Sequence, residues 1–225
     1  MKRFPLISAA CALASICLAL PQVAAQQADD VPEYVPPVRG APSGRVGGGT
    51  RGLQALPLTA LSPSHTGLTI SPQPALYYFA PGAAKPRLAL RPASDPSSQP
   101  LVEKDLPALR GAVIQRLELR SLGVTLTPGV EYRWTVSMPG ETREASGTIQ
   151  RIEPTAELSR KLAATSGRSR YAMLAREGLW YDALDEVSRA VEAAPNNPLP
   201  ARHRAALLEQ IGLTAVARHE RQRYE

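Results

Sequence analysis

The chain has 225 residues, with 26 Lys and Arg against 20 Asp and Glu, which gives a formal net charge of +6 at pH 7. The basic residues are interleaved with acidic ones and are not clustered with aromatic residues, so the charge pattern argues against a nucleic-acid-binding surface. The only two cysteines, Cys11 and Cys17, lie in an apolar N-terminal stretch.

Residues 1–25 are predicted to be a secretory signal peptide. Two basic residues precede an apolar run from Leu6 to Leu20, and small residues stand where cleavage after Ala25 would occur. The run is shorter than the ~20 residues of a membrane-spanning helix, so we expect no transmembrane anchor after cleavage. We therefore expect an exported protein, periplasmic or extracellular, whose mature chain has no thiol for a disulfide or a metal site.

Residues 26–52 are rich in proline and glycine and contain few large apolar side chains. Such a segment cannot bury enough surface to fold alone, so we expect an extended, flexible arm that docks at its end. Its glycine-rich part could bind an anion through backbone N–H groups, although the ending of a phosphate-binding loop is missing. Alternatively, the glycines only permit a tight crossing into the first strand. The weak anion-binding candidates are Arg45, Gly48, Thr50 and Arg51.

Residues 53–153 are predicted to form a β-sandwich-like domain. Apolar and polar residues alternate strictly over Val130–Met138, which indicates a strand with one buried face. Tyr132 and Trp134 fall on that face, so core packing is favoured over a carbohydrate platform. Ala145–Ile152 is expected to return as the partner strand of a hairpin. The other expected strands are Leu68–Ser71, Ala75–Ala80, Pro86–Leu90, Leu101–Lys104 and Val113–Arg120. Short strands joined by Pro/Gly turns favour an antiparallel sandwich of immunoglobulin-like kind.

Residues 154–225 are predicted to form a helical region of three to four helices, which makes the fold class α+β. Apolar residues from Trp180 to Ala194 recur at three and four positions, as on one face of a helix. Asp182 and Asp185 fall on the opposite face and are expected to be exposed. After Pro195, Asn197 is suited to cap a new helix that begins at Pro198.

The stretch that opens the first of these helices is a candidate interaction or structural motif. Its residues are Gly178, Leu179, Trp180, Tyr181, Asp182, Ala183 and Leu184. We expect Trp180 in the core, whereas Tyr181 lies off the apolar face and is assigned to a contact between helices or with a partner. The motif recurs in outline 34 residues later, at Gly212 and Ala217, and is similar to the second helix of a tetratricopeptide repeat. A free-standing array needs about three units, so this hairpin must lean on the strand region or on a partner.

The stretches Gly44–Gly52, Leu126–Trp134 and Gly178–Leu184 together resemble a bacterial family catalogued as Domain of Unknown Function 928. Their order and spacing extend the resemblance over residues about 44–215. Members of that family look like exported, soluble proteins without an assigned activity. The resemblance thus implies localisation and architecture, and it implies no catalytic residue.

The sequence holds no recognisable catalytic or metal-binding constellation. The three histidines have no partner at metal-site spacing, and no nucleophile elbow is present. We therefore expect no cofactor, no metal and no catalytic residue. The favoured hypothesis is a non-catalytic protein-interaction or envelope-associated protein whose partner is another envelope or extracellular protein, with no nucleic acid. The alternatives are a carbohydrate- or envelope-binding module and an enzyme with a non-standard site.

Overall fold

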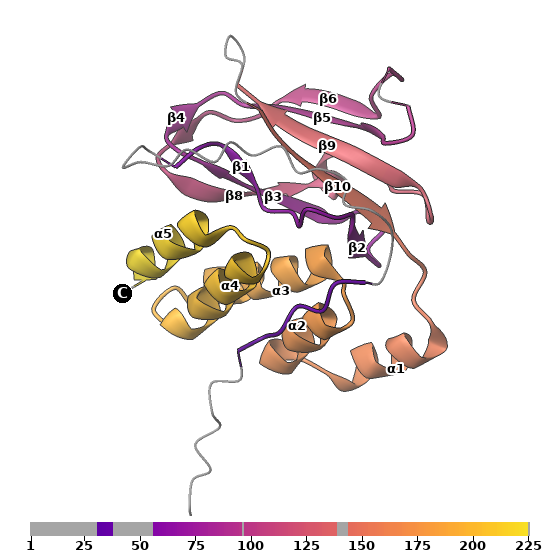
Figure 1. Cartoon of the computed structure of the whole chain (residues 1–225), viewed down its shortest axis with the longest axis vertical. Coiled ribbons are helices and arrows are strands. Elements are labelled where there is room, and N and C mark those ends of the chain that lie inside the picture. Colours follow the sequence, from indigo (N-terminus) through magenta and orange to yellow (C-terminus); the bar gives the residue numbers. More distant parts are fainter. Residues whose placement is uncertain (1–30, 38–55, 96, 139–143, 225) are drawn as a thin grey trace, which may run out of the picture. The chain divides into compact units, whose positions relative to one another are not determined.

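The structure is a computed structural model that describes residues 31–37, 56–95, 97–138 and 144–224 (Figure 1). The predicted signal peptide and the anion-binding candidates Arg45, Gly48, Thr50 and Arg51 lie outside these ranges. Residues from Val31 to the C-terminus belong to one compact unit. Strands are followed by helices, so the fold class is α+β as predicted. No helix among the described residues is long and apolar enough to cross a membrane.

The strands form a five-stranded sheet of order β2-β10-β9-β5-β6, a three-stranded sheet of order β1-β3-β8, and a small β4-β7 pair. Their bounds are β1 (Thr59–Ala60), β2 (Gly67–Thr69), β3 (Ala75–Ala80), β4 (Ala83–Ala84), β5 (Arg87–Pro92), β6 (Val102–Asp105), β7 (Leu109–Arg110), β8 (Val113–Glu118), β9 (Glu131–Ser137) and β10 (Glu144–Arg151).

The predicted hairpin is confirmed, because β9 and β10 pair antiparallel with Trp134 opposite Gly147. The prediction that the sheets are antiparallel throughout is wrong at β2, which runs parallel to β10 with Gly67 opposite Ile149. A parallel pair cannot be joined by a short turn, and here the two strands come from opposite ends of the strand region. The immunoglobulin-like arrangement stays a prediction.

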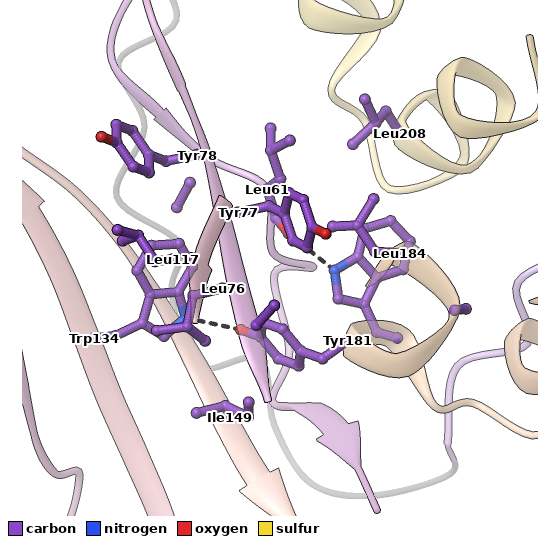
Figure 2. Close-up of a cluster of buried hydrophobic side chains, with 14 of the residues drawn as sticks. Leu61, Leu76, Tyr77, Tyr78, Leu117, Trp134, Ile149, Tyr181, Leu184 and Leu208 are labelled. Carbon is purple, nitrogen blue, oxygen red and sulfur yellow. Dashed lines mark hydrogen bonds between the residues drawn. The ribbon is translucent and has the colours of Figure 1, made fainter. Parts of the chain in front are cut away.

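Strand β3 is buried along its whole length, because it has a packed layer on each side. On one side, the hydroxyl of Tyr77 donates to Asp185 at 2.7 Å, and the ring of Phe79 meets His219 edge-on at 5.1 Å. Side chains alternate along a strand, so Leu76 and Tyr78 point the other way, where Figure 2 shows Trp134 of β9. Strand β3 thus lies between β9 and the helices, whereas β2 of the five-stranded sheet contacts α3 directly.

Five helices follow the strands in the described residues, where three to four were predicted. They are α1 (Ala156–Ala164), α2 (Gly167–Arg176), α3 (Trp180–Ala193), α4 (Pro198–Gln210) and α5 (Thr214–Tyr224), and a short 3₁₀ turn, η1 (Leu119–Leu122), precedes them. The extra boundary comes from a break at Thr165 and Ser166, which separates α1 from α2. The hydroxyl of Thr155 accepts from the N–H of Leu158 and caps α1.

Helix α3 packs against α2 on one side and α4 on the other, and α4 packs against α5. The predicted start of α4 is confirmed, because the side chain of Asn197 accepts from the N–H of Leu199 at 3.0 Å. Left-handed glycines precede α3 and α5, with φ of 74° at Gly178 and 79° at Gly212. The likeness to a tetratricopeptide repeat stays a prediction. Of the two supports considered for this region, the strands provide one, since α3 contacts β2 and β3.

Candidate functional site

The motif Gly178–Leu184 lies where the helices meet the sheets and the N-terminal segment Val31–Pro37. Gly178 has a positive φ, and a Cβ there would lie 3.1 Å from the carbonyl oxygen of Val35. Trp180 is fully buried as predicted, and its indole N–H donates to the carbonyl of Leu61 at 2.9 Å. Leu179, Ala183 and Leu184 are also fully buried. The motif therefore joins three parts of the fold and presents little of itself to solvent.

Tyr181 occupies a different place from the one predicted. Its ring is fully buried and reaches from α3 to the five-stranded sheet (Figure 2). Its hydroxyl accepts from the indole N–H of Trp134 at 2.9 Å and donates to the carbonyl of Thr148 at 2.9 Å. Burial raises the pKa of this phenol, so it stays neutral and can hold both bonds. The prediction that Tyr181 contacts another helix or a partner protein is thus wrong, because its hydroxyl binds groups of the five-stranded sheet.

Two sheet glycines make room for Tyr181 and its partners. A Cβ on Gly67 would lie 2.6 Å from Cε2 of Tyr181, and a Cβ on Gly147 would lie 2.5 Å from Cβ of Ser62. Neither glycine was predicted to have this role. In a sequence, the only signal for a close approach of another residue to a strand is an isolated glycine within it.

A polar cleft of about 360 Å³ opens beside this junction, between β8, α3 and the segment that leads into β3. It combines side chains of both charges with neutral polar groups. Its lining residues are Ser71, Gln73, Pro74, Ala75, Arg116, Glu118, Arg120, Tyr181, Asp182, Asp185 and Arg189. We call it the α3–β8 cleft.

Asp185 holds the charged lining of the α3–β8 cleft together. Its carboxylate accepts from the hydroxyl of Tyr77 at 2.7 Å, from Nε of Arg116 at 2.9 Å and from Nε of Arg189 at 2.9 Å. Arg189 follows Asp185 by one turn on α3, so the two form an i,i+4 ion pair. The prediction that Asp185 is exposed is wrong, because its side chain is only 20% exposed. With three donors bound to it, the carboxylate of Asp185 holds Tyr77, Arg116 and Arg189 in place.

Asp182 lies one turn earlier on α3 and was also predicted to be exposed. It is instead half-buried, and its Oδ2 accepts from the N–H of Ile70 at 3.0 Å. Removal from water raises its pKa to about 7, to which the charge of Asp185 adds, while hydrogen bonds from Ile70 and Thr69 oppose the rise. The α3–β8 cleft therefore has one carboxyl group that can exchange a proton near neutral pH and one that positions cations.

The remaining candidates from the sequence are spread over the fold. Tyr132 and Trp134 are 4% and 0% exposed, as predicted for core residues. His203 is buried and is hydrogen-bonded to Tyr171 at 2.6 Å, whereas His65 contacts Tyr34 and His219 contacts Phe79. Within the described ranges, no three His, Cys, Asp or Glu side chains form a group that could hold a metal ion.

Sequence reasoning did not connect Arg116 and Arg120 with the acidic residues of α3 that line the α3–β8 cleft. Arg116 comes from β8, Arg120 from η1 and Arg189 from α3, so sixty-nine positions separate the first from its bonding partner Asp185. No spacing rule links residues that only the packing of a helix on a sheet brings together.

Comparison with known proteins gives a family and no activity. No curated protein matches the chain. The model of the family described as Domain of Unknown Function (DUF928) matches residues 46–221, which is most of the chain, and the chain therefore belongs to this family.

Proposed function

We propose that this chain is an exported, non-catalytic binding protein that uses the α3–β8 cleft to hold a charged segment of another envelope or extracellular protein. The observation that carries the proposal is the network around Asp185. One carboxylate fixes Tyr77 and two arginines beside an opening of about 360 Å³. Side chains held in place before binding lose little entropy when a partner arrives, which favours recognition.

The charges in the cleft support a polypeptide partner. Arg116, Arg120 and Arg189 stand among Glu118, Asp182 and Asp185, so the surface offers both signs of charge over a short distance. A protein segment that carries complementary acidic and basic side chains would meet both, and such complementarity provides specificity. The side chain of Arg189 is 58% exposed, so it is suited to a first contact.

The carbohydrate-binding alternative gains no support from the aromatic residues that suggested it. Tyr132 and Trp134 are buried, so their faces are not available to stack on a sugar ring. The enzyme alternative would rest on Asp182 alone, whose pKa of about 7 suits proton transfer. Asp182 already accepts from the main chain of Ile70, which gives the carboxyl group a structural role and favours binding over catalysis.

Export is tested by measuring the mass of the protein recovered from each cell fraction. We expect the envelope or medium fraction to contain a chain that begins at Gln26, because cleavage after Ala25 removes the signal peptide. Recovery of the uncleaved chain from the cytoplasm alone would refute export.

Binding is tested by capture from envelope extract with purified wild-type protein, followed by reconstitution with the purified partner. Charge reversals Arg120→Glu and Arg189→Glu should weaken the reconstituted complex by about tenfold or more at low salt. Arg202→Glu is the matched control, since Arg202 is exposed on α4 and does not line the cleft. A complex that is equally tight with all three variants would exclude the cleft as the binding surface, and a glycan array tests the sugar alternative.

A further inference from the structure

The segment Val31–Pro37 lies extended across the helical part of the fold, near the ends of α2 and α4 (Figure 1). The N–H of Val35 donates to the carbonyl of Ala175 at 3.2 Å. The side-chain amide of Gln210 accepts from the N–H of Tyr34 at 2.7 Å and donates to the carbonyl of Pro32 at 2.8 Å. One amide that binds a backbone donor and a backbone acceptor sets the register of an extended chain whatever its side chains are.

Tyr34 supplies the side-chain anchor of this segment. It is 7% exposed, its ring meets Trp180 edge-on at 5.0 Å, and its hydroxyl is hydrogen-bonded to Nε2 of His65 at 2.8 Å. Pro32 is buried as well, whereas Glu33 points to solvent, so inward and outward side chains alternate. Main-chain bonds combined with pockets for alternate side chains are how proteins recognise extended peptides.

Gly178 provides clearance for the main chain of the segment. A Cβ on Gly178 would lie 3.1 Å from the carbonyl oxygen of Val35 and 3.2 Å from Cδ of Pro37. A cavity of about 580 Å³ continues beside the segment. It is lined by Glu33, Tyr34, Pro36, Pro63, Ser64, His65, Gln210 and Ile211. We use the name arm groove for the surface that receives the segment, formed by Pro63, Ser64, His65, Gln210 and Ile211 together with Ala175 and Gly178.

We propose that the arm groove is a peptide-binding site, filled in cis by Val31–Pro37, that also takes the same segment from a second copy of the chain. Residues 38–55 connect the segment to the rest of the protein and could span up to about 60 Å. A reciprocal exchange between two copies keeps every contact described above, because groove and segment are identical in both.

The outward face of the segment favours a second copy as the occupant's source. Val31 and Val35 are 50% and 46% exposed and are two of the three large hydrophobic residues that are exposed among the described residues. Both lie on the same side of an extended chain, with the exposed Glu33 between them, so this face carries two apolar side chains on either side of a carboxylate. A contact with a second copy can cover these two valines, which the cis arrangement leaves exposed to solvent.

The test uses the full chain and a labelled synthetic peptide of residues 29–38. In the variant Tyr34→Ala the cis segment loses its anchor, so we expect the peptide to bind this variant about tenfold more tightly than wild type, whose own segment competes at an effective concentration in the millimolar range. The same peptide carrying Tyr34→Ala should not bind. Gln210→Ala, added to the Tyr34→Ala chain, should abolish binding of the wild-type peptide.

The second copy is tested by complementation. A Tyr34→Ala chain has an intact groove and a Gln210→Ala chain has an intact segment, so their mixture should form a mixed dimer in native mass spectrometry that neither forms alone. Val35→Pro replaces Tyr34→Ala if that variant does not fold, because it removes only the N–H bond to Ala175 and changes an exposed side chain. A folded variant that binds neither the peptide nor a second chain would overturn the proposal. Peptide binding without the mixed dimer would overturn the second copy as occupant.

Discussion

The indole N–H of Trp134 on β9 donates to the hydroxyl of Tyr181 on α3 at 2.9 Å, across the junction between the five-stranded sheet and the helices. The same hydroxyl donates to the carbonyl of Thr148 on β10. Two strands and a helix are therefore tied through one oxygen atom. Because all three groups are buried, each depends on the others for its hydrogen bond.

We predict that Tyr181→Phe lowers the free energy of unfolding by about 1–3 kcal/mol, because the indole N–H and the carbonyl of Thr148 each lose their bond to the hydroxyl. Urea unfolding followed by circular dichroism measures the change. Tyr224→Phe, near the end of α5, is the control and should stay within about 0.5 kcal/mol of wild type. Equal effects of the two substitutions would show that the buried hydroxyl contributes nothing.

We predict that Gly147→Ala destabilises the protein by about 1–3 kcal/mol, because its Cβ would lie 2.5 Å from Cβ of Ser62 and 2.9 Å from Nε1 of Trp134. Gly82→Ala is the matched control, since a Cβ there meets nothing within 4 Å. Thermal unfolding of the two variants side by side measures the difference. A melting temperature for Gly147→Ala equal to that of Gly82→Ala would contradict the close packing at the junction.

Trp180→Ala is expected to cost about 3–5 kcal/mol, because it removes a fully buried ring and leaves a cavity. The substitution also leaves the carbonyl of Leu61 without the indole donor and removes the edge-on ring contact with Tyr34. Guanidinium unfolding measures the loss. An unchanged midpoint would show that this side chain does not belong to the core.

Stability should depend on pH through Asp182. Its pKa is about 7 in the folded protein, above the usual value of 3.8, so between these values the folded state keeps a proton that the unfolded chain has released. The free energy of unfolding therefore falls as pH rises through that window. Asp182→Asn keeps an oxygen acceptor for the N–H of Ile70 but replaces the titratable carboxyl group with an amide that does not titrate. We expect this variant to gain stability relative to wild type from pH 4 to pH 8, measured by urea unfolding, and a constant difference would contradict the raised pKa.

The helical part contains a buried ion pair between α4 and α5. Nε of Arg204 on α4 donates to Glu220 on α5 at 2.8 Å, and the two side chains are 7% and 1% exposed. Arg204→Met leaves a buried carboxylate without its cation and should cost about 3–5 kcal/mol. The double variant Arg204→Met with Glu220→Leu should recover most of that loss in thermal unfolding.

The control for this ion pair is the exposed pair of Arg221 and Glu209, which joins the same two helices. Arg221→Met should change stability by less than about 1 kcal/mol, because water screens charges at the surface. If the buried and the exposed pair gave equal losses, burial would not be the cause of the difference.

Local patterns were enough to predict several elements. Residues Ala75–Ala80 form a strand with the predicted ends, and the alternation around Trp134 identified its buried face. Asn197 and Pro198 marked the start of α4 correctly. These features depend on backbone preferences and on neighbours a few positions away, so they can be read from a single segment.

The burial of Tyr181 and Asp182 could not be predicted in the same way. Apolar periodicity reports one buried face of a helix, but α3 is covered on a second face by β2 and β3. That second face consists of residues with polar tips, which bind sheet groups such as the N–H of Ile70 and the indole of Trp134. In the sequence such residues look the same as exposed ones.

The sequence by itself determined that strands precede helices, where several of them begin and end, and which tryptophans enter the core. Only the tertiary structure decided that β2 pairs parallel to β10, that Arg116 meets Asp185, and that Tyr34 docks near Gly178. The physical reason is that periodicity and capping act between near neighbours, whereas these contacts depend on the direction in which distant segments pack. The α3–β8 cleft and the arm groove both depend on such contacts between distant segments.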